Sequence, residues 1–130
     1  MNILCGTDIV EVGRIKKAIE TGARFVEKVY TGPETEYCES KKSGRYESYA
    51  ARFAAKEAFA KAVGAGLFKG VALTDAEVVN DAGGAPFLRL RGGAAEAFAR
   101  AGGKSVSVSL SHTAEIATAV VVILCEQQTE

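Results

Sequence analysis

The sequence is poor in the residues from which disulfide frameworks and zinc sites are built. Its 130 residues include one histidine and three cysteines, Cys5, Cys38 and Cys125. An odd number of widely spaced cysteines does not form a disulfide framework, and one histidine is too few for a Cys/His zinc site. We therefore expect reduced thiols in an intracellular, cytoplasmic protein, with Cys5 and Cys125 as small core residues of apolar strands.

The chain also lacks an excess of charge and a long apolar run. Its 16 basic and 16 acidic side chains give a net charge of zero, which argues against a general binder of nucleic acid or of membrane surfaces. The longest apolar run, 116–125, is about half of the ~20 residues that a membrane helix needs. The N-terminus has no basic start and reaches Asp8 early, unlike a signal peptide. With 48% hydrophobic and 25% charged residues, the composition predicts a single globular domain over 1–130.

Periodicity and turn residues predict an α+β domain in which a mostly antiparallel sheet packs against a long helix. The helix over 45–63 is rich in Ala, Lys and Glu, contains no Gly or Pro, and ends at Gly64. The run 116–125 predicts a central strand buried on both faces, paired with a strand at 106–110 through a short loop after His112. The other expected elements are strands at 3–10, 71–80 and 87–91 and helices at 11–21, 24–30 and 94–101. A further helix is expected after a break at 31–33, with Thr31 or Gly32 as its cap and Pro33 at its first position.

Two carboxylates lie where apolar side chains are expected. In the first strand, Asp8 is in phase with Leu4 and Val10. On the long helix, Glu57 lies in a row with aromatic side chains one turn apart, whereas Lys56 points to roughly the opposite side. Burying an unpaired charge costs several kcal/mol, so each carboxylate needs a partner.

Two kinds of partner are open for these carboxylates. Lys61, one turn after Glu57, explains Glu57 as half of an ordinary salt bridge, and spacing alone favours that explanation. It leaves Asp8 unexplained. A hard divalent cation such as Mg²⁺ explains both, because it commonly takes one or two protein carboxylates and completes its shell with waters and phosphate oxygens.

A polar cluster at the end of the 106–110 strand is a second candidate site. His112 continues the apolar phase of that strand, and a lone histidine in such a place is more often structural than catalytic. Ser111 and Thr113 beside it, with their backbone N–H groups, would form a small anion-binding cluster. A structural histidine and an anion contact therefore both remain open.

Basic residues gather near the N-terminus. Arg14, Lys17, Arg24 and Lys28 occur there, with Phe25 among them. Acidic side chains share the region, so a solvated face of mixed charge is the default interpretation. The sharper alternative is a docking surface for an acidic partner.

Three blocks of the sequence together resemble the holo-acyl-carrier-protein synthases, the compact bacterial type of 4′-phosphopantetheinyl transferase. The blocks are GTDIVEVGRI (6–15), RFAAKEAFAK (52–61) and VSLSHT (108–113), the last followed by an apolar strand. The middle block is highly specific, and the resemblance covers nearly the whole chain. It implies an α+β fold with a long helix on an antiparallel sheet, and a symmetric trimer with each active site at a subunit boundary.

The chain departs from the family pattern at two positions. Thr7 stands where an aliphatic residue is usual. In the turn of Gly84, Ala85 and Pro86, the family has lysine at the middle position, so Ala85 removes a charge from the nucleotide contacts of that turn. The segment 92–103 is also longer than in compact members of the family.

The resemblance implies transfer of 4′-phosphopantetheine from coenzyme A to a serine of apo acyl carrier protein, with Mg²⁺ and release of adenosine 3′,5′-bisphosphate. Asp8 and Glu57 match the metal ligands of the family, and Lys61 would stabilise charge on the pyrophosphate. The serine proton would pass to Glu57, directly or through a water, or else to His112. The nucleotide contacts that the resemblance assigns are His112 with Ser111 and Thr113, which would bind the 3′-phosphate across the subunit boundary, and more weakly Arg45, Arg52, Gly84 and Pro86.

The resemblance also assigns the N-terminal basic residues. Arg14, Arg24 and Phe25 match positions that dock the carrier protein, which is strongly acidic. The alternatives are a non-catalytic module that binds coenzyme A or an acidic protein on the same scaffold, and a different metal-dependent phosphotransferase. The acceptor is open between fatty-acid and polyketide carrier proteins. The expected metal is Mg²⁺, and oxygen ligands would also suit Mn²⁺.

Overall fold

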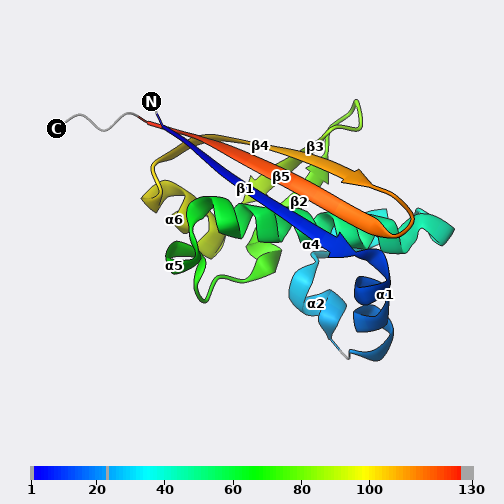
Figure 1. Ribbon diagram of the computed structural model, residues 1–130. Helices are drawn as coiled ribbons and strands as arrows, with labels where there is room; N and C mark the ends of the chain where they lie inside the picture. The colour runs from blue at the N-terminus through cyan, green and yellow to red at the C-terminus, as the bar shows by residue number, and fades with distance from the viewer. Residues whose placement is uncertain (1, 23, 127–130) are drawn as a thin grey trace.

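The computed structural model describes residues 2–22 and 24–126 and shows two antiparallel sheets beside one long helix (Figure 1). The larger sheet has the order β1–β5–β4, formed by Asn2–Glu11, Ile116–Cys125 and Gly103–His112. The smaller sheet pairs β2 (Ala76–Asn80) with β3 (Pro86–Leu90). The predicted α+β architecture is confirmed, and β5 is the central strand, as expected.

Helix α4 (Arg45–Val63) runs along the larger sheet and has the predicted bounds (Figure 1). The other helical elements are shorter: α1 (Val12–Thr21), α2 (Phe25–Val29), α3 (Gly32–Glu39), η1 (Lys42–Gly44), α5 (Ala65–Phe68), η2 (Leu73–Asp75) and α6 (Gly92–Arg100). Thr31 caps α3, because its hydroxyl accepts from the Glu34 N–H while the Glu34 carboxylate accepts from the Thr31 N–H. Of the two predicted caps, Thr31 is therefore the correct one, and Pro33 is the second residue of the helix, whereas the first position was predicted.

Three predicted elements differ from the structure by two residues or more at an end. The strand predicted over 71–80 is confined to Ala76–Asn80, because the turn η2 precedes it. The helix predicted over 94–101 begins at Gly92. The strand predicted over 106–110 extends over Gly103–His112, since the ten-residue β5 pairs with it along that length. Long-range pairing therefore sets the ends of β4, and local propensity does not.

Gly6 lets β1 lie directly on α4. A Cβ atom at this position would lie 2.0 Å from the Ala58 carbonyl oxygen and 2.7 Å from the Ala62 nitrogen. The helix meets the strand with alanine, and Ala54 and Ala58 are fully buried. Short side chains on both elements thus allow a close approach of the two backbones, which fixes Asp8 beside the next turn of the helix.

The two faces of the larger sheet differ. The inner face, toward α4, carries Val121 and Ile123, both at 0% exposure. The outer face keeps five large aliphatic side chains between 37% and 66% exposed: Ile3, Ile9, Ile116, Val120 and Val122. The prediction that the central strand is buried on both faces is therefore wrong for the single chain.

Of the two cysteines predicted to be core residues, one is buried and the other is exposed. Cys125 is buried, as expected, but Cys5 is exposed. The period of a strand places Cys5 in phase with Ile3 on the outer face, and it lies opposite Val122 of β5. All three cysteines are free thiols. Among the helices of the described residues, none is long and apolar enough to cross a bilayer.

Candidate active site

Strand β1 and helix α4 bring Asp8 and Lys61 together. The Lys61 Nζ donates to Asp8 Oδ1 at 2.9 Å and to the Thr7 carbonyl at 3.0 Å. The Asp8 side chain is 15% exposed and that of Lys61 is 57% exposed. Lys61 thus pairs with Asp8 of the strand. Helix spacing had favoured a salt bridge of Lys61 with Glu57, and the structure does not show that pair.

Glu57 lies half-buried beside this pair. Burial raises its pKa, the Asp8 carboxylate raises it further, and Lys61 and Arg14 oppose that rise. Lys61 forms its ion pair with Asp8, so among the described residues the partly desolvated Glu57 carboxylate has no ion-pair partner within 4.0 Å. This fits a divalent cation such as Mg²⁺, for which two protein carboxylates suffice. Within residues 2–22 and 24–126 no three Asp, Glu, His or Cys side chains cluster, so the protein ligands would be these two.

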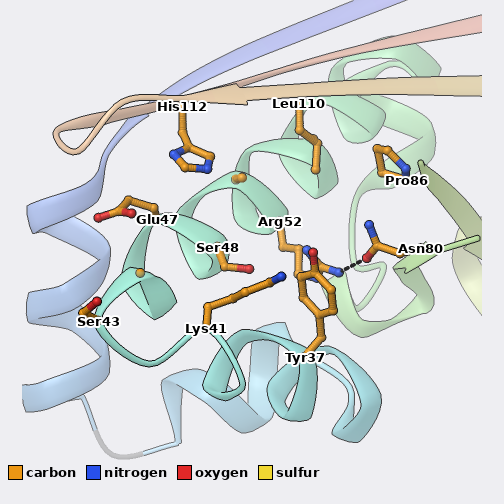
Figure 2. A pocket seen from close by; sticks show the side chains of 12 residues that line it. Tyr37, Lys41, Ser43, Glu47, Ser48, Arg52, Asn80, Pro86, Leu110 and His112 are labelled. Carbon is orange, nitrogen blue, oxygen red and sulfur yellow. Dashed lines mark hydrogen bonds between the residues drawn. The ribbon is translucent and has the colours of Figure 1, made fainter. Parts of the chain in front are cut away.

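A second feature is a pocket of about 580 Å³ between α3, η1, α4 and the ends of β3 and β4 (Figure 2). Three of the predicted nucleotide contacts line it: Arg52, Pro86 and His112. The other predicted nucleotide contacts are not among the lining residues: Arg45, Gly84, Ser111 and Thr113. The lining also includes none of the residues of the carboxylate cluster, so the two features are separate within one chain.

Three of the four predicted contacts outside the lining have local structural roles, and Ser111 is exposed. The Arg45 Nε lies 3.9 Å from the Glu39 carboxylate. Gly84 forms the β2–β3 turn with a φ of +89°, a conformation that favours glycine. The Thr113 hydroxyl accepts from two backbone N–H groups of the β4–β5 loop, and Ser111 is exposed on β4. Gly84 and Thr113 thus hold the turns that flank the pocket.

Arg52 is the most deeply buried charged group of the pocket. It is 3% exposed, its Nη2 donates to Asn80 Oδ1 at 2.6 Å, and its guanidinium carbon lies 4.0 Å from the centroid of the Tyr37 ring. Its Nε has no hydrogen-bond partner, and no carboxylate of the described residues lies within ion-pair distance of it. A buried guanidinium without a compensating carboxylate is suited to binding an anion.

Lys56 has a structural role that was not predicted. It lies on the side of α4 away from Glu57, as predicted, but this side is also fully buried. Its ammonium donates to Glu34 Oε1 at 2.8 Å, to the Leu73 carbonyl at 3.0 Å and to the Ala76 carbonyl at 2.9 Å. Burial lowers the pKa of Lys56, and the Glu34 carboxylate opposes that shift. The available signal was the alanine on every side of the helix, which indicates burial all round.

The predicted docking residues lie at α1 and α2. Arg14 is exposed and close enough to Glu57 to lower its pKa. Arg24 is exposed, has a left-handed φ of 76°, and lies 3.6 Å from the Glu27 carboxylate. Phe25 is half-buried, with its ring centroid 6.1 Å from that of Phe53. The structure therefore places Arg14 beside the carboxylate cluster and part of Phe25 against the core.

The family to which the chain belongs follows from comparison with known proteins. The 4′-phosphopantetheinyl transferase superfamily matches residues 4–121. The chain belongs to this superfamily. The resemblance carried by the three sequence blocks, and the transferase class that it implied, are thereby confirmed.

Relatives and solved structures agree over nearly the whole chain. The holo-[acyl-carrier-protein] synthase of Ruminiclostridium cellulolyticum is 54% identical over 124 residues, which cover 95% of this chain and 92% of the relative. That of Treponema denticola is 47% identical over 118 residues, 91% of this chain and 94% of the relative.

Two solved structures share the fold. An ACPS–CoA complex from Chronobacterium ammoniagenes has a TM-score of 0.86 at 25% identity and covers 98% of this chain and 100% of its own. The holo-(acyl-carrier-protein) synthase from Bacillus anthracis, in complex with CoA (3′,5′-ADP), has a TM-score of 0.75 at 38% identity, over 92% of this chain and 94% of its own. The predicted fold of the family is therefore confirmed.

Proposed function

We propose that this chain transfers 4′-phosphopantetheine from coenzyme A to a serine hydroxyl of apo acyl carrier protein, with Mg²⁺, and releases adenosine 3′,5′-bisphosphate. The observation that carries the proposal is the cluster of Asp8, Glu57 and Lys61, in which Lys61 pairs with Asp8 and the half-buried Glu57 lies close enough for Asp8 to raise its pKa. Relatives named as holo-synthases and a related structure solved with CoA support the choice of substrates.

The chemical difficulty of this reaction is negative charge. The serine oxygen forms a bond to the phosphorus that bears the pantetheine arm, and the bond from that phosphorus to the bridging oxygen of the pyrophosphate breaks. Asp8 and Glu57 would hold Mg²⁺, which would neutralise charge on the pyrophosphate. Lys61, with its side chain 57% exposed, would extend its ammonium to the departing phosphate and stabilise the charge that develops there.

The serine proton needs an acceptor. Glu57 belongs to the cluster that would face the pyrophosphate, whereas His112 lines the separate pocket. We therefore assign proton acceptance to the Glu57 carboxylate and nucleotide contact to His112. A variant His112→Ala that keeps its maximal rate but needs more coenzyme A would support this division, and a loss of rate at saturating coenzyme A would reverse it.

The pocket suits the nucleotide of coenzyme A. Arg52 supplies a buried, unpaired guanidinium, and Pro86 and His112 supply further walls (Figure 2). Arg45, Gly84, Ser111 and Thr113 remain proposed contacts that border this region. Since Ala85 carries no charge, this chain relies on its other cations for the nucleotide.

We also propose a homotrimer with the active sites at its subunit boundaries. The exposed aliphatic side chains on the outer face of the larger sheet favour burial against other copies of the chain. The carboxylate cluster and the nucleotide pocket share no lining residue within one chain, so a neighbouring subunit would complete each site. Light scattering should give three copies, and Cys5 should resist alkylation in the assembly; a monomer with reactive Cys5 would refute the trimer.

The acidic carrier protein would dock along α1 and α2. Arg14 and Arg24 would pair with its carboxylates, and the exposed part of Phe25 would add apolar contact. Arg14→Ala should raise the KM for the carrier protein more than that for coenzyme A, and added salt should weaken docking. Equal changes in both constants would count against this surface.

The alternative function is a non-catalytic module that binds coenzyme A or an acidic protein on the same scaffold. The Asp8–Glu57–Lys61 cluster disfavours it, because a binding module has no need of two carboxylates held beside each other. The three free thiols suit a cytoplasmic enzyme, and we propose that location.

One experiment separates these functions. The chain is incubated with coenzyme A, magnesium and an apo acyl carrier protein, and the carrier is weighed by intact mass spectrometry. We expect a gain of one phosphopantetheine arm that a chelator abolishes. Binding of coenzyme A without any gain in mass would favour the binding module instead.

A further inference from the structure

The ammonium of Lys61 binds the same carboxylate that the proposed divalent cation needs. Its Nζ lies 2.9 Å from Asp8 Oδ1 and 3.0 Å from the Thr7 carbonyl oxygen. The Asp8 side chain is 15% exposed, so little water screens the charges that gather on it. Lys61 and a cation therefore cannot both bind Asp8 without repelling each other.

Lys61 is held loosely enough to leave Asp8. Its side chain is 57% exposed, and an ion pair with so exposed a partner is weak. Within residues 2–22 and 24–126 its ammonium has two acceptors for three donors, and one of the two is the neutral Thr7 carbonyl. Lys56 on the same helix is fully buried and has an acceptor for each of its three donors. Lys61 can thus give up Asp8 and keep the Thr7 carbonyl as an acceptor.

Glu57 favours the divalent cation over the lysine. It lies half-buried beside Asp8 and close enough for the Asp8 carboxylate to raise its pKa. Among the described residues it has no ion-pair partner, so it does not help to hold Lys61. A divalent cation can take oxygens from both carboxylates, whereas Lys61 pairs with one of them. The second carboxylate therefore gives the cation the advantage in a competition for Asp8.

We propose that Lys61 is an internal counter-ion of Asp8 that the divalent cation displaces, so that its ammonium becomes available to the pyrophosphate only when the cation is bound. Because coupling between two binding events is reciprocal, the Lys61–Asp8 pair weakens metal binding by the factor by which the metal weakens the pair. This inference rests on the metal site of the proposed function. It gives Lys61 a second role, which precedes its contact with the donor.

The first test measures metal binding without coenzyme A. The probe is Mn²⁺, which oxygen ligands also suit, and electron paramagnetic resonance measures the free ion while intact protein is titrated. We expect Lys61→Met to bind Mn²⁺ about fivefold more tightly than the wild type, which is the factor that loss of one exposed ion pair allows. Lys69→Met is the control, since it removes the same charge from an exposed position after α5, and its affinity for Mn²⁺ should equal that of the wild type.

The second test follows the ammonium itself in the wild-type protein. An ammonium that donates a charge-assisted hydrogen bond to a carboxylate exchanges its protons with water more slowly than a free one. In nuclear magnetic resonance of ¹⁵N-labelled lysine side chains, we expect Mg²⁺ to move the Lys61 signal toward those of free exposed lysines. The signal of the buried Lys56 should not change and serves as the internal control. This test stands even if Lys61→Met does not fold.

Several outcomes would overturn the proposal. One is equal Mn²⁺ affinity in Lys61→Met and the wild type, and another is a Lys61 signal that Mg²⁺ leaves unchanged. Equal tightening in Lys61→Met and Lys69→Met would reduce the effect to net charge. A wild-type protein that binds no Mn²⁺ would remove the metal site and this inference with it. Absence of transfer to the carrier protein, with both metal results as expected, would refute the proposed function alone.

Discussion

Helix α4 carries two lysines in opposite environments. Lys56 is fully buried with Glu34, and all three of its ammonium donors have acceptors within 3.0 Å. The Lys61 side chain is 57% exposed and pairs with Asp8, while Glu57 beside them has no ion-pair partner among the described residues. We call the side with Lys56 the closed side, because the Lys56 ammonium has all its donors satisfied there and its contacts join α3 and β2 to the core. We call the side with Glu57 and Lys61 the open side, because Glu57 has no ion-pair partner there among the described residues. A carboxylate without a partner is suited to a cation, and the exposed Lys61 to a diphosphate.

The largest effect that we expect comes from the closed side. Lys56→Met leaves the Glu34 carboxylate buried without its cation, and should lower the free energy of unfolding by about 3–5 kcal/mol. Urea denaturation followed by circular dichroism measures this loss. Lys61→Met is the matched control, and its half-exposed pair should cost about 1 kcal/mol or less. Similar losses from the two variants would contradict the contrast between the two sides.

The same two variants should reverse their order when transfer is measured. Lys61→Met removes a positive charge aimed at the departing phosphate, and should lower kcat about 100-fold while the protein remains folded. The carrier-mass assay, run at a temperature where both variants are native, gives the rates. The Lys56→Met variant, folded under those conditions, should keep most of its activity. A greater loss of kcat in Lys56→Met than in Lys61→Met would place catalysis on the closed side.

Gly6 offers a way to disturb the open side through the backbone alone. Gly6→Ala places a methyl group 2.0 Å from the Ala58 carbonyl oxygen, so β1 must move away from α4 and carry Asp8 with it. We expect a loss of stability of about 1–3 kcal/mol together with a higher magnesium requirement. Gly13→Ala, which meets nothing within 4 Å, is the control. An unchanged magnesium dependence in Gly6→Ala would show that the close approach does not position Asp8.

The smallest expected effect is a pH dependence of stability in the metal-free protein. Burial and Asp8 raise the pKa of Glu57 in the folded chain. Between the ordinary carboxyl pKa and this raised value, the folded state binds more protons than the unfolded state, so stability falls as pH rises. In chelator, Glu57→Gln should therefore have a higher Tm than the wild type at neutral pH and a similar Tm in acid. A Tm difference that does not change with pH would remove this explanation.

The candidate site could be predicted from sequence where its chemistry follows strand or helix phase. Asp8 and Glu57 broke an apolar phase in two separate elements, and the structure brings both to Lys61. The pairing of Lys61 with Asp8 was not predictable, because it depends on how closely β1 approaches α4 at Gly6. The pairing of Lys56 with Glu34 was also not predicted. The two residues lie on different helices, and neither interrupts an apolar pattern in the sequence.

The outer sheet face and the nucleotide pocket show a second limit of local patterns. Alternation identified which residues of β1 and β5 share a face, but not that one face stays exposed in the single chain, as Cys5 does. Tyr37 and Lys41 meet Arg52 only because α3 folds back against α4. Contacts of this kind depend on the crossing of elements, about which local periodicity carries no information.

The sequence by itself determined the elements, the α+β class and the inward phase of Asp8 and Glu57, because side-chain periodicity and helix propensity are local properties. The tertiary structure decided which charges meet. It buried the Lys56–Glu34 ion pair, left the Lys61 side chain of the Asp8 pair exposed, and placed Lys41 and Arg52 against the ring of Tyr37. Each of these choices depends on burial, and burial exists only once separate elements have packed together.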